Sequence, residues 1–280
     1  MSGADGALAG KRIGFVGGGA MAEALAGGLL AAGVPPESVR VSDVAPERRA
    51  HLERTLGVRA TDDNADVTRH SDVVVLAVKP AVVEEALASI AADASVDLTR
   101  PLWISIAAGV PLARLERALA DRARIVRAMP NTPALVRAAA TAYCANARAD
   151  AADLAVAGAL FQGVGVTWEA PEEALLDAVT GLSGSGPAYV FLLLEALVAA
   201  GEREGLPHDA AHRLACQTAL GAAQLALGSE RSPAELREQV TSPGGTTLAG
   251  LQRLDALGFR EALGEAVAAA TRRSKELGSS

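Results

Sequence analysis

KRIGFVGGGAMAEALAGGLL, residues Lys11 to Leu30, is the stretch that decides the fold. An apolar run from Ile13 to Val16 leads into a glycine cluster and then into a segment rich in alanine and leucine, which predicts a strand, a tight turn and a helix. Gly17, Gly19 and Ala22 match the pattern G-x-G-x-x-G/A of dinucleotide-binding turns. Glycines also cluster at strand-helix turns for packing reasons alone, so the stretch by itself leaves both interpretations open.

The residues after this turn favour the dinucleotide. A pyrophosphate at the N-terminus of the helix would meet free N–H groups and the positive end of the helix dipole. A second expected strand, Val39 to Ser42, ends at Asp43, where an acid would hydrogen-bond the adenosine ribose. The turn residues expected to contact the coenzyme are Gly17, Gly18, Gly19, Ala20 and Met21.

Strand and helix patterns alternate through the first 170 residues. Strands are expected at 13–16, 39–42, 58–60, 72–78, 102–106 and 125–129, with helices between them, and two last strands at 139–144 and 166–168 flank a helix over 151–161. This alternation predicts a parallel sheet with right-handed crossovers. Ligands of such sheets bind beyond the carboxyl ends of the strands, where the glycine turn, 78–80, 107–109 and 130–132 would converge.

From Pro171 onward the strand signal disappears. Helices are expected over 172–180, 187–204, 208–227, 233–240, 247–257 and 260–277. We therefore predict an α/β chain with a Rossmann-type parallel sheet domain over 1–170 and an all-α domain over 171–280. The apolar run Ala188 to Ala200 is too short to span a bilayer and predicts a buried helix. Helices apolar on more than one side predict packing against a second subunit, with a bundle closed within one chain as the alternative.

Composition excludes several classes of function. A formal net charge of −7 over 280 residues argues against nucleic-acid and membrane-surface partners, which require a basic stripe. Cys144 and Cys216 lie far apart, which indicates neither a disulfide framework nor a zinc ribbon and points to the cytoplasm. The N-terminus lacks the pattern of a signal peptide. His208 and His212 have the spacing of a metal pair, but no third ligand is evident, so we expect no metal.

Two glycine-rich segments interrupt the expected helices. They read TGLSGSGPAY from Thr180 to Tyr189 and VTSPGGTTL from Val240 to Leu248. Each is either a helix cap, or a cluster of free N–H groups and hydroxyls at a helix N-terminus that suits a small carboxylate. The residues alone favour neither interpretation over the other.

Both segments, together with GFVGGGAMAEAL, AVKP, MPNTP and the order of the elements, closely resemble the pyrroline-5-carboxylate reductases. The resemblance covers nearly the whole chain. It implies a Rossmann domain followed by a helical domain for substrate binding and dimerisation. It also implies that NADPH or NADH reduces the C=N bond of 1-pyrroline-5-carboxylate to give L-proline, the last step of proline biosynthesis.

The resemblance also implies site residues, since the family pattern TSPGGxT matches Thr241 to Thr247. It assigns the substrate carboxylate to Ser242, Gly244, Gly245 and Thr246. Thr247 would reach the ring nitrogen and is the candidate catalytic residue, and Glu230 corresponds to a glutamate that lines the site in some members. The implied coenzyme contacts beyond the glycine turn are Asn64, Ala77, Val78, Lys79, Pro80, Ala107 and Ala108.

Two other functions share this architecture. Hydroxyacid dehydrogenases of similar layout use a lysine in the helical half, but this chain has only Lys11, Lys79 and Lys275, of which the last lies in a terminal turn. A dinucleotide-binding regulator would bind coenzyme without turnover. The coenzyme is open: Asp43 favours NADH, whereas Arg48 and Arg49 would pair with the 2′-phosphate of NADPH, which the family commonly uses. We lean slightly to NADPH.

Overall fold

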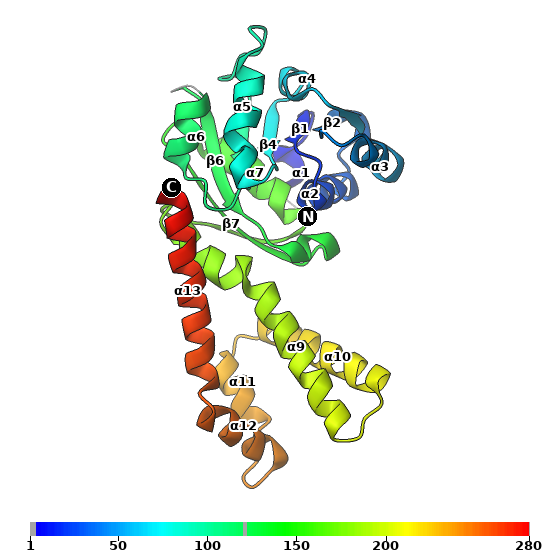
Figure 1. The fold of residues 1–280 in the computed structure, drawn as a ribbon, viewed down its shortest axis with the longest axis vertical. Coiled ribbons are helices and arrows are strands. Elements are labelled where there is room, and N and C mark those ends of the chain that lie inside the picture. The colour runs from blue at the N-terminus through cyan, green and yellow to red at the C-terminus, as the bar shows by residue number, and fades with distance from the viewer. Residues whose placement is uncertain (1–3, 120–121, 280) are drawn as a thin grey trace. The chain divides into compact units, whose positions relative to one another are not determined.

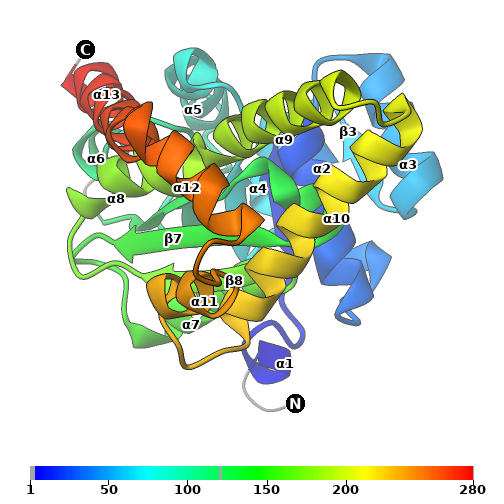
Figure 2. The same ribbon diagram turned by 90° about the horizontal axis from the view of Figure 1, so that it is seen from below.

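The computed structural model describes residues 4–119 and 122–279 and divides into two compact units. The first comprises Met1–Ser185 with Ala268–Ser280, and the second comprises Gly186–Val267. Figure 1 and Figure 2 label their elements. The boundary at Ser185 follows from packing, because helix α8 (Leu175–Val179) and the end of helix α13 (Phe259–Ser279) belong to the sheet unit. The functional division into 1–170 and 171–280 stays a prediction.

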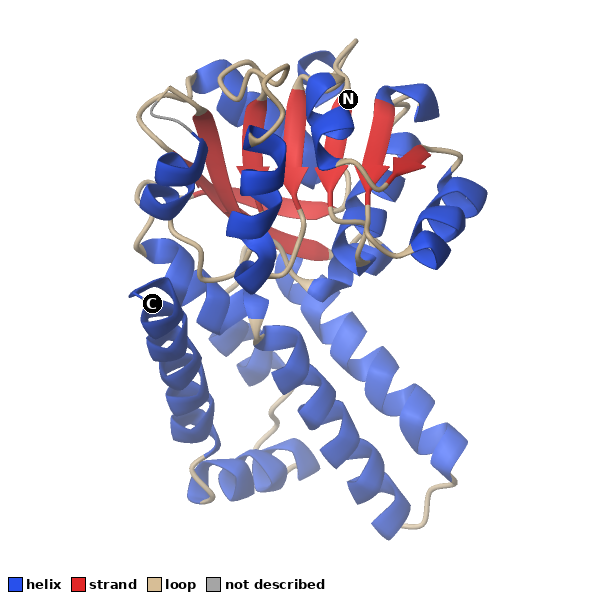
Figure 3. Cartoon of the chain, turned by 45° about the horizontal axis from the view of Figure 1, so that its top comes forward, coloured by secondary structure: helices blue, strands red, loops and turns tan. Residues whose placement is uncertain are grey.

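An eight-stranded sheet forms the centre of the first unit, in the order β3-β2-β1-β4-β5-β6-β7-β8. Figure 3 shows these strands in red. Their bounds are β1 (Ile13–Val16), β2 (Val39–Ser42), β3 (Arg59–Thr61), β4 (Val73–Leu76), β5 (Leu102–Ser105), β6 (Arg124–Met129), β7 (Ala139–Ala145) and β8 (Gly165–Glu169). The helices are α1 (Ala4–Ala7), α2 (Ala20–Ala31), α3 (Pro46–Leu56), α4 (Asn64–Arg69), α5 (Val83–Ala91), α6 (Leu112–Leu119), α7 (Ala151–Gln162) and α8.

The first six strands are parallel, as predicted, and their order is that of a Rossmann sheet. The expectation of a parallel sheet is wrong for the last two strands, since β7 runs antiparallel to β6 and β8 runs parallel to β7. The connection from β6 to β7 contains only a 3₁₀ turn, Thr132–Val136. A connection this short returns the chain antiparallel, because a parallel neighbour requires a crossover of a dozen residues or more.

The central strands β1, β4 and β5 are buried on both faces, which explains their unbroken apolar runs. In β4, Val73 and Val75 face one hydrophobic cluster, whereas Val74 and Leu76 face another. The first cluster includes residues of α2 and α7, and the second includes residues of α5 and α6. The two helical layers hold the strand ends in place, and the predicted coenzyme residues follow those ends.

The second unit is helical and has little core of its own. It contains α9 (Gly186–Arg203), α10 (His208–Leu227), α11 (Pro233–Gln239), α12 (Thr246–Ala256) and the start of α13. Figure 1 and Figure 2 show α9 and α10 side by side, and Val198, Ala211 and Ala215 are their buried residues. The expectation that Ala188 to Ala200 is buried is wrong within this chain, because Phe191 and Leu192 are 63% and 66% exposed.

The expectation of a helix break at TGLSGSGPAY is also wrong. The backbone stays helical from Leu175 to Arg203, and Thr180–Gly184 forms a π-helical turn in which the Ser185 N–H donates to the Thr180 carbonyl at 2.8 Å. Pro187 has no N–H for the carbonyl of Ser183, four residues earlier. The Asn131 amide donates to that carbonyl instead, at 3.0 Å. By length and composition alone, this helical stretch is also the one among the described residues that is suited to a membrane span.

Asn131 therefore connects two segments, because its Oδ1 accepts the N–H of Ala140 in β7 at 2.9 Å. We expect Asn131→Asp to destabilise the chain by about 1–3 kcal/mol, since the new oxygen would leave the half-buried Ser183 carbonyl without a donor. Urea unfolding followed by circular dichroism measures the change. Gln162→Glu makes the same chemical change at a weak 3.5 Å contact and should shift stability by less than about 0.5 kcal/mol. Equal effects of the two substitutions would contradict this role of Asn131.

Candidate functional site

The glycine turn after β1 contains glycines of two kinds. Gly17 has φ +97°, and a Cβ there would lie 2.9 Å from the carbonyl carbon of Ala77. Gly18 would meet Leu52 at 2.8 Å. Packing alone explains these two positions. Gly19 is different, because an added Cβ would have no atom within 4 Å and its φ of −65° suits any residue.

Gly19 is also the N-cap of α2, so the open space at its Cα lies beside the free N–H groups of the first helical turn. An anion that approaches this backbone closely gives a reason for glycine that the fold does not. The turn thus fits a pyrophosphate.

Asp43 is positioned by backbone N–H groups on both sides. Its Oδ2 accepts the N–H of Gly18 at 2.9 Å, and its Oδ1 accepts the N–H of Ala45 at 2.9 Å. Asn64 lies nearby, with its Oδ1 accepting the Ser42 hydroxyl at 2.7 Å and its Nδ2 donating to Ser89 at 3.2 Å. The carboxylate therefore lies at the end of β2 beside the glycine turn.

A pocket of about 380 Å³ opens at the ends of β2, β3 and β4 and brings together four of the predicted coenzyme residues, Gly17, Asp43, Asn64 and Val78. Its other lining residues are Ser42, Val44, Asp62, Asp63, Ala65, Val82, Glu85, Ala86 and Ser89. Sequence reasoning missed Glu85 and Ser89 of α5. Their spacing of four residues, just after the AVKP segment, places both on one helical face and was an available signal.

The remaining predicted coenzyme residues follow neighbouring strands at the same edge of the sheet. Ala77 is hydrogen-bonded to β1 through the Val16 carbonyl at 2.8 Å, and Lys79 and Pro80 begin a 3₁₀ turn after β4. Ala107 and Ala108 follow β5, and the next residue, Gly109, has φ +74°. A Cβ at Gly109 would approach Leu277 of α13 to 3.0 Å, so the C-terminal helix packs against this loop.

In the second unit, the predicted substrate residues form a turn before α12. The N–H of Gly245 donates to the Ser242 carbonyl at 3.0 Å, and Gly244 has φ +72°, as in a type II turn with proline at its second position. A Cβ at Gly245 would lie 2.3 Å from the Ser242 hydroxyl oxygen, so that hydroxyl lies over the turn. This segment is a helix N-terminus, whereas TGLSGSGPAY is not.

Thr246 and Thr247 begin α12 and are exposed, and their N–H groups have no intrahelical acceptor. The turn therefore presents backbone donors and hydroxyls suited to a small carboxylate. Glu230 lies in the connection between α10 and α11, and the described residues show no hydrogen bond between it and the turn. Its part in the site stays a prediction.

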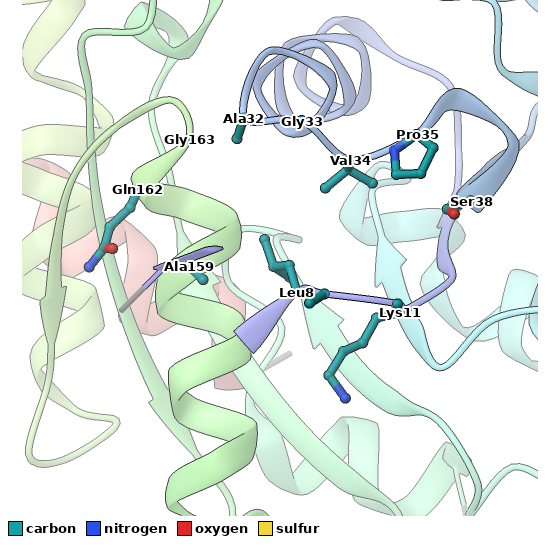
Figure 4. Close-up of a pocket in the computed structure, with 12 residues that line it drawn as sticks. Leu8, Lys11, Ala32, Gly33, Val34, Pro35, Ser38, Ala159, Gln162 and Gly163 are labelled. Carbon is teal, nitrogen blue, oxygen red and sulfur yellow. The ribbon is translucent and has the colours of Figure 1, made fainter. Parts of the chain in front are cut away.

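A second cavity of about 370 Å³ lies at the opposite edge of the sheet, before β1 and at the C-terminal ends of α2 and α7 (Figure 4). Among the described residues that line it, none is a predicted site residue and Lys11 is the one charged side chain. Over the part of the chain that the structure describes, no three His, Cys, Asp or Glu side chains are grouped to hold a metal.

Three glycine substitutions separate fold from binding. Gly19→Ala should leave stability within about 0.5 kcal/mol but weaken ADP-ribose binding about tenfold or more, because the new methyl group fills the space for the pyrophosphate. Gly17→Ala should lower both the stability and the affinity for ADP-ribose. Gly27→Ala, inside α2 with only an ordinary 3.8 Å contact to Leu56, should raise stability by about 0.5–1 kcal/mol and leave binding unchanged. Calorimetric titration and urea unfolding measure both quantities, and full binding by Gly19→Ala would contradict the site.

The comparisons with known proteins agree along the whole chain. Residues 173–277 match the family model for pyrroline-5-carboxylate reductase dimerisation, which indicates a homo-oligomer. Residues 12–109 match the model for coenzyme F420-dependent NADP oxidoreductases. The chain is 49% identical to the pyrroline-5-carboxylate reductase of Synechocystis, over 95% of this chain and 98% of the relative.

Solved structures give the same result. A pyrroline-5-carboxylate reductase from Coxiella burnetii has a TM-score of 0.89 and 40% identity, over 95% of this chain and 98% of that one. The Plasmodium falciparum enzyme, solved with NADP bound, has a TM-score of 0.85 and 31% identity, over 96% of this chain and 98% of that one. The chain belongs to the pyrroline-5-carboxylate reductase family.

Proposed function

We propose that the chain reduces the C=N bond of 1-pyrroline-5-carboxylate to L-proline with NADH or NADPH, as the last step of proline biosynthesis. The observation that carries this proposal is the turn before α12, which offers a small carboxylate free backbone donors in a chain that also has an open glycine turn. The family relationship supports the same activity.

The coenzyme residues have separate tasks in this proposal. Gly17, Gly18, Gly19, Ala20 and Met21 hold the pyrophosphate at the start of α2. Asp43 and Asn64 face the adenosine ribose from the pocket beside β2. Ala77, Val78, Lys79, Pro80, Ala107 and Ala108 line the edge of the sheet beyond β4 and β5. A bound nicotinamide coenzyme supplies the hydride.

The substrate residues orient the imine. Ser242, Gly244, Gly245 and Thr246 bind the carboxylate, and Thr247 hydrogen-bonds the ring nitrogen from the first turn of α12. A protonated imine accepts a hydride at carbon without a metal, so positioning supplies much of the rate. The electron pair of the C=N bond passes to nitrogen. A threonine hydroxyl is too weak an acid to supply the nitrogen's proton alone, so that proton comes with the protonated imine or from water.

The helical unit favours an imine over a ketone as substrate. Reduction of a carbonyl requires an acid for the developing alkoxide, and lysine fills that role in hydroxyacid dehydrogenases of this layout. Residues 186–267 contain no lysine. A protonated imine already carries the proton that a ketone lacks, so the absence of lysine there is consistent with this chemistry.

The proposal includes a homodimer, or an assembly of dimers, in the cytoplasm. Phe191, Leu192 and Leu220 are exposed on α9 and α10, and burial by a second copy would cover them. A net charge of −7 favours neither nucleic acid nor a membrane surface as partner. The cysteines Cys144 and Cys216 are both free, in keeping with a reducing compartment.

The activity is tested by following absorbance at 340 nm with each reduced coenzyme and 1-pyrroline-5-carboxylate, with pyruvate as the control substrate. We expect oxidation with the imine and none with the ketone. Thr247→Ala should lower kcat about tenfold, because loss of the hydrogen bond to nitrogen leaves the imine less well oriented for hydride transfer, and Thr247→Ser should restore it. Coenzyme affinity should not change in either variant, nor kcat in the surface control Thr55→Ala. An unaltered kcat in Thr247→Ala would refute the role of this hydroxyl.

The assembly is tested by light scattering after size exclusion. Leu192→Glu, which places a charge on the exposed face of α9, should convert the oligomer to a smaller species. Leu135→Glu makes the same change at a similarly exposed leucine of the sheet unit, 58% exposed, and serves as the control. An unchanged mass for Leu192→Glu would place the contact elsewhere.

A further inference from the structure

The pocket beside β2 is lined with acids. Asp43, Asp62, Asp63 and Glu85 contribute carboxylates, and no lysine, arginine or histidine is among the described residues that line it. Asp63 is partly compensated, because it caps α4 through the N–H groups of Ala65 and Asp66. Asp43 likewise accepts two backbone N–H groups, and Asp62 lies 3.7 Å from the guanidinium of Arg49.

Arg48, the first candidate to bind a 2′-phosphate, already has partners within the chain. Its Nε donates to the Gly18 carbonyl, and its Nη2 forms an ion pair with Glu23 of α2. His51 approaches the other oxygen of Glu23 at 2.9 Å. Burial raises the pKa of Glu23, but the hydrogen bonds from His51 and Arg48 outweigh that effect and lower it, so Glu23 is a carboxylate that holds Arg48.

Arg49, the second candidate, is bound to the backbone at the end of β2. Its Nη1 donates to the carbonyls of Asp43 and Val44 at 2.8 and 3.1 Å. Its Nη2 lies 3.7 Å from a carboxylate oxygen of Asp62. A phosphate would have to displace these partners to recruit this guanidinium.

Asp43 itself suits a free hydroxyl. The N–H groups of Gly18 and Ala45 occupy one acceptor direction of each carboxylate oxygen, and each oxygen keeps a second. A ribose 2′-hydroxyl can donate to that second direction. A 2′-phosphate instead brings about −1.5 to −2 charges to the same place, next to Asp43 and facing Asp62 and Glu85.

We infer that this chain discriminates against the 2′-phosphate and uses NADH in preference to NADPH, with Asp43 as the residue that determines specificity. The inference rests on the proposed function for the identity of the ligand. It reverses the slight lean to NADPH, which followed the common use of NADPH in the family. The two arginines that could have paired with a 2′-phosphate are held by Glu23, by Asp62 and by backbone carbonyls.

The discrimination is tested with fragments that transfer no hydride. ADP-ribose and 2′-phospho-ADP-ribose are titrated into the full chain by calorimetry, and the ratio of kcat/KM for NADH and NADPH is measured in parallel. We expect ADP-ribose to bind about ten- to a hundredfold more tightly at low salt, from a charged hydrogen bond gained in one complex and a repulsion in the other. The difference in affinity between the two fragments should narrow as the salt concentration rises, because salt screens the repulsion.

Variants locate the cause. Asp43→Asn should reduce the preference about tenfold or more. Because Asp43 also supports the glycine turn, Asp62→Asn provides a second test. This exposed acid lines the pocket and lies 3.7 Å from Arg49, so its neutralisation removes a repulsive charge and releases that guanidinium. It should raise the affinity of 2′-phospho-ADP-ribose but not that of ADP-ribose. Glu23→Gln releases Arg48 and should act in the same direction. Glu37→Gln, at the far end of β2, removes an equal charge and should change neither affinity.

Equal binding of the two fragments, or tighter binding of the phosphorylated one, would overturn the inference. So would an unchanged preference in all of Asp43→Asn, Asp62→Asn and Glu23→Gln. Failure of the proposed function gives a different result, namely no oxidation of either coenzyme with the imine while the fragments still bind. The titration therefore decides the coenzyme preference whatever the outcome of the activity assay.

Discussion

The close approach of Gly17 to Ala77 is the constraint on which the rest of the site depends. The turn after β1 passes so near the end of β4 that no side chain fits at residue 17, and this contact directs the chain into α2. The same turn places the Gly18 N–H against Asp43, which draws the end of β2 to the start of α2. Four neighbouring strands, β3, β2, β1 and β4, thus present their carboxyl ends to one pocket.

A second interaction links sequence motifs that are distant in the chain. Asn131 of MPNTP hydrogen-bonds both β7 and the Ser183 carbonyl, which Pro187 of SGSGPAY leaves without a helical donor. Each motif therefore explains residues of the other, because the asparagine of one satisfies the carbonyl that the proline of the other leaves free. A Cβ at Gly184 would come within 2.5 Å of Met129, so the π-helical turn also packs on the end of β6. These segments, unlike the turn before α12, need no ligand to account for their composition.

Local pattern predicted most elements well. The runs at β1 and β2 were sufficient for the bounds of these strands. The antiparallel direction of β7 was not predictable from alternation, since it depends on how far the 3₁₀ turn after β6 can carry the chain. The π-helical turn was missed because it depends on Asn131, about fifty residues away. Helix α4 has only six residues, which carry too little periodicity for the sequence pattern to predict a helix there.

Part of the site could be predicted from the sequence and part of it could not. The glycine pattern and the end of β2 predicted where a pocket forms, and the structure places Gly17, Asp43, Asn64 and Val78 together there. The sequence did not reveal that Arg48 and Arg49 are already bound, because their partners come from α2 and from the backbone. The roles of Glu230 and Thr247 toward a substrate remain predictions.

In the proposed reaction, hydride passes from the coenzyme directly to the carbon of the C=N bond. Reduction with coenzyme deuterated at the transferring position of the nicotinamide, followed by mass spectrometry and NMR of the product, tests it most directly. We expect proline with one deuterium, on the ring carbon that was doubly bonded to nitrogen. Proline without deuterium, or with deuterium on another carbon, would contradict it.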